Sequence, residues 1–266
     1  MIRLLKIEWL KLLYYKTFWI LSVLYIGSIY GLNFIVYKNM QNIYTKQQTK
    51  GMANVIMGKM PYAFPSTWQM TSFVSSFLLV MPALFIIISI TNEYSFKTHR
   101  QNVIDGISRT QFISVKFLLV IFVAILSSIA VFITAWSFGV QEGSSSFSLS
   151  NLHYLGYYFL QAVVYGLVAV LFSILFKRSG ITTGVFILYA LVFENVIAAL
   201  LNKYANNIGR YLPIESSDML IPMPVFRSIQ KQFTTEPNYN FLFVATLIYI
   251  VLFTVLSKIK FEKSDL

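Results

Sequence analysis

Six long apolar runs constrain this chain more than any other feature of its sequence. A helix needs about 20 apolar residues to cross ~30 Å of hydrocarbon. Charged residues make up only 12% of the 266 residues and the mean hydropathy is +0.67, a balance that ordinary soluble domains do not have. The sequence therefore predicts an all-α, polytopic membrane protein with one domain (1–266) and six transmembrane helices: Phe18 to Val36, Thr71 to Ile90, Phe117 to Trp136, Tyr154 to Leu175, Ile181 to Leu201 and Phe241 to Leu256.

The distribution of Lys and Arg predicts how these helices are oriented. Residues 1–17, 92–116, 176–180 and 257–266 hold 13 Lys and Arg in 57 positions, whereas the alternate set of loops holds 8 in 87. Segments rich in Lys and Arg stay in the cytoplasm, so we expect both termini there. The net charge of +11 sits in short segments beside apolar runs. We attribute it to topology in a lipid bilayer and expect no nucleic-acid partner.

The first residues form an amphipathic segment. On a helical wheel, one face of residues 2–14 is apolar, and the charged side chains lie away from it. The pattern predicts a helix over residues 1–17 that lies along the cytoplasmic leaflet. The alternative interpretation is a charged flank of the first span. The apolar face consists of Ile2, Leu5, Trp9, Leu12 and Leu13.

A polar loop, residues 92–110, separates the second and third apolar runs. Its sequence from Asn92 is NEYSFKTHRQNVIDGISR. Phe96, Val103, Ile104 and Ile107 fall at helical separations, which predicts a short amphipathic helix with an apolar knob and a basic flank. Gly106 is expected to stop or bend it, and a serine follows that is suited to cap the next helix.

This loop resembles the one between the second and third spans of ABC exporter permeases of the type V class, which includes bacitracin, lantibiotic and polysaccharide exporters. In that family a Glu ends the second span and is followed by Gly-Thr, an Arg, and then Pro, Ser and Arg. Lys97 stands here in place of the family's Gly, and Gly106 in place of its Pro. The resemblance implies that the loop couples the membrane domain to an ATPase through Glu93, Phe96, Lys97, Thr98, Arg100, Gly106, Ser108 and Arg109.

The same resemblance implies a fold, a set of partners and a location. Residues 1–17 would be the elbow helix and the polar loop a cytoplasmic coupling helix. The chain would act in a bacterial inner membrane with a second permease copy, as a homodimer or a heterodimer, and with two copies of a separate ATPase. Residues 202–240 carry apolar pieces between Pro213, Pro222 and Pro224. That pattern predicts short helices folded back on the outer surface, as the family has between its last two spans.

Several signatures of chemistry are missing from the sequence. It contains no GxxxxGK[ST] phosphate-binding loop, so any ATPase must be a separate polypeptide. Its two histidines, His99 and His153, belong to no metal-binding pattern, and there is no cysteine. We therefore expect a transport subunit rather than an enzyme, with no cofactor and no metal.

Glu194 is the one acid inside an apolar run, and a charge at bilayer depth costs about 2.5 to 3.5 kcal/mol on insertion scales. It is either a polar point on a substrate path or subunit seam, or an outer-interface residue that pairs with Lys203 or is hydrated by the last loop. Gly180 and Gly184 form a GxxxG pattern in the same run, which would permit close helix packing.

The sequence thus favours the membrane-spanning subunit of an ATP-driven exporter of a peptide, a lipid or an antibiotic-like molecule. The alternative is a secondary transporter without ATP, or a membrane scaffold subunit, in which the polar loop is an ordinary loop. Association with an ATPase separates the two interpretations.

Overall fold

The computed structural model describes residues 14–46, 51, 58, 60–98, 101, 104, 106, 108–143, 146–225 and 237–263. These residues form helices joined by turns and contain no strand, which confirms the all-α prediction. The predicted elbow helix lies almost wholly outside them. Much of the predicted coupling helix between the second and third spans does too.

In the described part of the chain, five helices are long and apolar enough to cross a membrane, so the chain is a membrane-embedded protein. They are α2 (Lys16–Thr45), α7 (Arg109–Glu142), α8 (His153–Phe176), the joined helix Ser179–Tyr204, and α13 (Tyr239–Glu262). The joined helix consists of α9 (Ser179–Leu188), a short π-helix η1 (Tyr189–Phe193) and α10 (Glu194–Tyr204).

The predicted second span, Thr71 to Ile90, is broken into two helices. Helix α4 (Ser66–Ser76) and helix α5 (Val80–Ser95) meet at a bend of 48° across Phe77–Leu79. The break has a physical cause, because Pro82 has no amide to donate to the carbonyl of Leu78 and its ring crowds that carbonyl. The predicted six spans are obtained only if the bent pair counts as one span.

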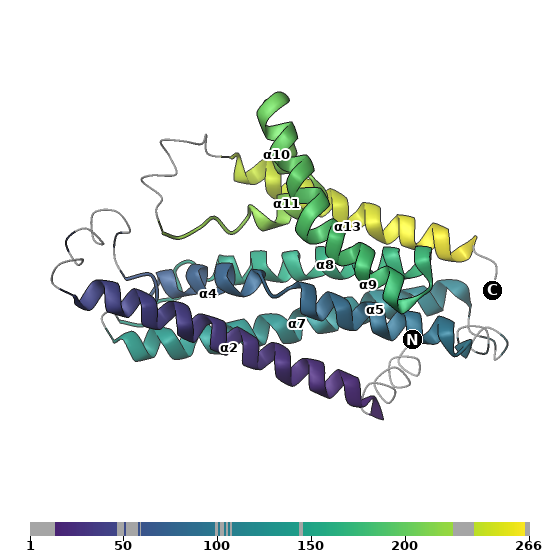
Figure 1. Ribbon diagram of the computed structural model, residues 1–266, viewed down its shortest axis with the longest axis horizontal. Coiled ribbons are helices and arrows are strands. Elements are labelled where there is room, and N and C mark those ends of the chain that lie inside the picture. Colours follow the sequence, from purple (N-terminus) through teal and green to yellow (C-terminus); the bar gives the residue numbers. More distant parts are fainter. Residues whose placement is uncertain are drawn as a thin grey trace.

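Helix α8 forms the centre of the bundle. It packs against α5, α7 and α13, and it is the most buried of the candidate spans (Figure 1). Gly166 of α8 allows this close packing, since a Cβ there would lie 2.6 Å from a methyl carbon of Val120 on α7. The first residue of α2 and the last residue of α13 lie at one end of the bundle (Figure 1). This arrangement is compatible with an even number of crossings.

Between α10 and α13, the described residues form two short helices, as the sequence predicts. They are the 3₁₀-helix η2 (Ile208–Tyr211) and α11 (Pro213–Asp218), with Pro213 in the first helical position, where its missing amide costs no hydrogen bond. Helix α11 packs on α8 and α13. Helix α9 packs against α5 and α8, and α10 continues obliquely away from the bundle (Figure 1).

The predicted close packing at Gly180 and Gly184 is not found among the residues that the structure describes. A Cβ added at either position would meet nothing within 4 Å. The tight position in this region is Gly209, where an added Cβ would lie 2.3 Å from the carbonyl oxygen of Ala198 on α10. Because Gly209 has no side chain, the chain can pass directly against α10 at this position.

We expect Gly209→Ala to lower the thermal stability of the purified protein, because an overpacked contact costs about 1 to 3 kcal/mol. Gly184→Ala is the matched control and should be neutral or stabilising, since its Cβ enters open space within a helix. Thermal unfolding of both variants in the same detergent tests this. Equal melting temperatures would contradict the assigned contact.

Candidate functional site

The polar loop begins where α5 ends, and the end of α5 is a built turn. The amide of Phe96 donates to the carbonyl of Asn92, and the amide of Lys97 donates to the carbonyl of Tyr94. Lys97 has φ +55°, the left-handed conformation in which many helices end and which glycine adopts most readily. Here lysine adopts it.

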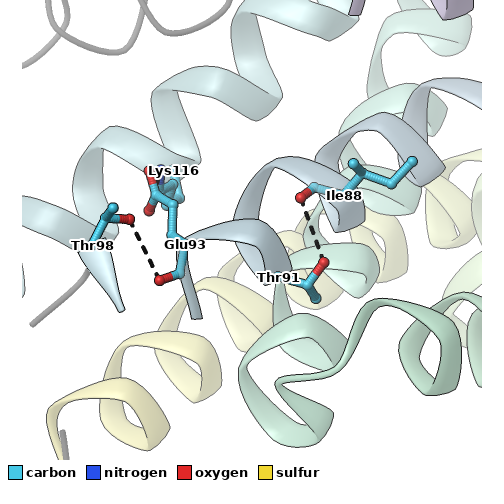
Figure 2. A network of polar contacts seen from close by, with 5 residues as sticks. All are labelled: Ile88, Thr91, Glu93, Thr98 and Lys116. Atoms are coloured by element: carbon cyan, nitrogen blue, oxygen red, sulfur yellow. Dashed lines mark hydrogen bonds and ion pairs between the residues drawn. The ribbon is translucent and has the colours of Figure 1, made fainter. Parts of the chain in front are cut away.

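Glu93 and Lys116 form an ion pair inside the protein (Figure 2). The ammonium of Lys116 on α7 lies 2.9 Å from a carboxylate oxygen of Glu93 on α5, and the two residues are 1% and 7% exposed. The same ammonium lies 5.0 Å from the ring centre of Phe112, one turn earlier on α7. A charge buried at this depth needs its partner, because removing one member of such a pair costs about 3 to 5 kcal/mol.

The start of α7 is joined to the end of α13. The side chain of Ser108 accepts a hydrogen bond from the amide of Gln111, and the Gln111 side chain accepts one from the amide of Ser108. This capping box confirms the prediction that Ser108 caps the helix. Arg109 donates to the backbone carbonyl of Glu262, and the Thr110 hydroxyl donates to the Glu262 carboxylate at 2.7 Å.

Further contacts bring other segments to the same end of the bundle. Asn92 donates to the hydroxyl of Tyr15, which precedes α2, at 2.7 Å. The ammonium of Lys177, in the turn between α8 and α9, lies 5.7 Å from the ring centre of Tyr94. Glu93, Tyr94 and Asn92 therefore tie the last turn of α5 to α7, to the α8–α9 turn and to the residues before α2.

The surface of the polar loop carries exposed apolar side chains. Phe96 is 75% exposed and Ile104 is 84% exposed. Thr98 donates to the carbonyl of Glu93 at 3.4 Å (Figure 2), and Gly106 has φ +90°, a backbone that fits the predicted bend. Arg100, Val103 and Ile107 lie outside the described residues. Among the predicted coupling residues, Glu93 is thus a buried anchor, Lys97 and Gly106 adopt turn conformations, and Phe96 is an exposed apolar contact.

Lys116 was not singled out by the sequence analysis, which counted it only among the loop cations. Its partner lies 23 positions earlier, so no local pattern joins the two residues. A signal was available, however, in the run FISVKFLLV, where one lysine stands among apolar residues on a predicted helix. A lysine in that setting either reaches water or has a buried acid as its partner.

Glu194 has a structural role that neither sequence interpretation named. It is 3% exposed, and its Oε1 accepts hydrogen bonds from the amides of Ile214 at 2.5 Å and Glu215 at 3.0 Å. These amides begin α11, where unpaired donors attract an acceptor. Within the described part of the chain, Glu194 makes no ion pair with Lys203, whose ammonium lies over the ring of Tyr204.

The other end of α11 is also held by a carboxylate. Asp218 accepts hydrogen bonds from the Gln161 amide at 2.7 Å and from the Tyr165 hydroxyl at 3.1 Å, both on α8. Burial raises the pKa of the Asp218 carboxyl to about 7, although these two hydrogen bonds lower it. The described residues contain no group of three side chains suited to hold a metal ion.

We expect Glu93→Met and Lys116→Met to destabilise the protein individually by about 3 to 5 kcal/mol each, because each leaves one buried charge without its partner. The double variant should recover most of this loss, since two apolar side chains can fill the space of the pair. Thermal unfolding of the three variants closes the cycle. Additive losses in the double variant would show that the pair is not coupled.

Glu194→Gln should fold with wild-type stability, because the amide oxygen of glutamine can accept the same two hydrogen bonds. Glu194→Leu should be destabilised by about 1 to 3 kcal/mol, since it leaves two buried amides without an acceptor. Thermal unfolding compares the two. A fully stable Leu variant would refute the structural role.

Comparisons with known proteins give one family. A search among curated proteins finds no match. The family model described as "Protein of unknown function (DUF2705)" matches residues 34–266, which include α5, the polar loop and α11. Because this match covers most of the chain's length, the chain belongs to that family.

Proposed function

We propose that this chain is the membrane-spanning subunit of an ATP-driven exporter. In this proposal two copies of the chain form the translocation unit, and two copies of a separate ATPase bind at the polar loop. In this proposal the chain is a transport subunit that leaves ATP hydrolysis to the separate ATPase, because its own sequence lacks a phosphate-binding loop. Both termini face the cytoplasm of a bacterium, and the protein lies in the plasma membrane.

The observation that carries the proposal is an exposed apolar turn mounted on a buried anchor. Phe96 projects from a turn that starts three residues after Glu93, whose ion pair with Lys116 fixes α5 to α7. A loop that serves only topology needs neither a buried charge pair nor an exposed phenylalanine. A docking element needs an exposed contact and a buried anchor. A force applied at Phe96 moves α5 and α7 only if the turn that carries Phe96 is held firmly to these helices.

The contacts also define which helices would move together. Glu93 and Lys116 join α5 to α7, and Arg109 and Thr110 join α7 to the end of α13. Closure of the ATPases would push on the polar loop and shift these three helices as one rigid body. The path for the substrate would then open or close between the two copies.

The proposed second copy needs a surface on the membrane domain. The helix Ser179–Tyr204 runs obliquely from the bundle (Figure 1), and Leu188, Val192 and Leu200 on it are exposed. Lipid or a second copy can cover such apolar side chains. In the proposed dimer, the second copy covers part of them.

The test is ATPase recruitment by variants of the polar loop. Arg100→Glu should abolish recruitment or substrate-stimulated ATP hydrolysis, because an acid would stand where a cation is complementary. Phe96→Ala should give a milder form of the same defect. Pull-down of the ATPase and hydrolysis in reconstituted membranes measure both, with membrane insertion and dimerisation expected to be unchanged.

Phe176→Ala is the matched control. Phe176 is also an exposed phenylalanine, and it lies beside Lys177, whose ammonium reaches Tyr94 at the same end of the bundle. This variant should recruit the ATPase normally. Wild-type recruitment and hydrolysis in Arg100→Glu and Phe96→Ala would reject the proposal and favour a secondary transporter or a scaffold subunit.

A further inference from the structure

An apolar groove that is partly open to the surface lies between α2, α5 and α7. Its volume is about 490 Å³, within the range of small-molecule sites. Helix α2 contributes one wall, α7 the facing wall, and α5 part of the floor through Pro82 and Phe85. Neither the family match nor the proposed coupling at the polar loop accounts for this groove.

The lining shows which chemistry the groove accepts. The residues that line it include no Asp, Glu, Lys or Arg. Two of its hydroxyl groups are bonded within the protein: Tyr25 to the hydroxyl of Tyr158 at 2.6 Å, and Thr134 to the carbonyl of Ala130 at 2.8 Å. An occupant therefore needs no polar group at these positions, and a peptide backbone would leave its own polar groups without partners.

The groove is continuous with the surface that faces lipid. Ile26 of α2 and Ile129 and Ile133 of α7 line it and are also exposed, so its mouth opens among side chains that contact hydrocarbon. Along α2 it extends from Phe18 to Tyr30, which is roughly 18 Å at 1.5 Å per residue. One leaflet contributes about half of the ~30 Å hydrocarbon core, so the groove matches one acyl chain in length.

A cation stands near the end of the groove at the membrane surface. Lys16, the first residue of α2, is exposed and lies two positions before Phe18. A lysine side chain is long enough to bring its ammonium to the level of the lipid head groups. The position therefore favours a lipid with a negatively charged head group over a neutral one.

We propose that the groove between α2, α5 and α7 holds one acyl chain of an anionic phospholipid, with its phosphate near Lys16. The lipid belongs to the leaflet at the N-terminal end of α2. It fills space that the helices leave open, and so it supports the contact of α2 with α5 and α7. This binding is independent of whether the polar loop recruits an ATPase.

The test uses the full chain in phosphatidylethanolamine and phosphatidylglycerol vesicles. A phosphatidylglycerol probe with a photoreactive group in its acyl chain is added, and the modified residues are located by mass spectrometry. The apolar face of α13 from Val244 to Leu256 is a shallow surface and reports ordinary lipid contact. We expect modification of the groove residues to exceed that reference.

Filling the groove should remove this excess. Ser22→Phe and Ala130→Phe place a ring in the groove from its two facing walls, so a folding failure of one variant leaves the other. Gly31→Phe is the control, because Gly31 does not line the groove and an added Cβ there meets nothing within 4 Å. Lys16→Glu should lower the excess for the phosphatidylglycerol probe and leave a phosphatidylcholine probe unchanged.

Three results would overturn the proposal. Groove modification no higher than on the α13 face would mean ordinary lipid contact. An excess that persists in both groove-filling variants would place the lipid elsewhere. Cross-links between two copies at the groove residues would show that a second copy of the chain, rather than a lipid, covers it.

Discussion

The ion pair between Glu93 and Lys116 is the interaction on which the arrangement of this end of the protein depends. Each charge is buried, so each makes the position of the other obligatory, and together they set how far α5 and α7 can slide. The turn of the polar loop and the cap at Ser108 both lie between these two residues in the sequence. Local hydrogen bonds shape the turn and the cap, and the ion pair holds the two helices that carry them together.

Features that depend on local sequence could be predicted, whereas features that depend on distant partners could not. Apolar runs indicated the long helices, and Ser108 at the end of the polar loop indicated a capped helix start, to which the structure adds Gln111 as the second half of the capping box. The break before Pro82 is an exception: its cause lies within four residues, but an apolar run alone predicts one continuous span. The partners of Glu194 lie 20 and 21 positions away, and charge patterns cannot reveal backbone amides as partners.

Buried carboxylates serve different purposes in two parts of the bundle. At the polar loop, Glu93 balances a buried cation and connects two long helices. Between α10 and α13, Glu194 and Asp218 hold the two ends of α11 through hydrogen bonds to neutral donors. The proposed coupling role therefore fits the first site, where a charge pair joins helices, whereas the second site holds a short helix in place.

The lengths of α2 and α7 have a consequence for the response to membrane thickness. Their 30 and 34 residues correspond to about 45 and 51 Å, well beyond the ~30 Å of a hydrocarbon core. Near the C-terminal ends of α2 and α7, the rings of Tyr37, Tyr62 and Phe138 pack with centroids 5.2 to 5.5 Å apart. These rings belong to a larger buried cluster with Met60, Met70 and Val74, which holds the extended ends of α2 and α7 together. A thinner or thicker bilayer would thus immerse a different stretch of these helices while leaving their mutual packing unchanged.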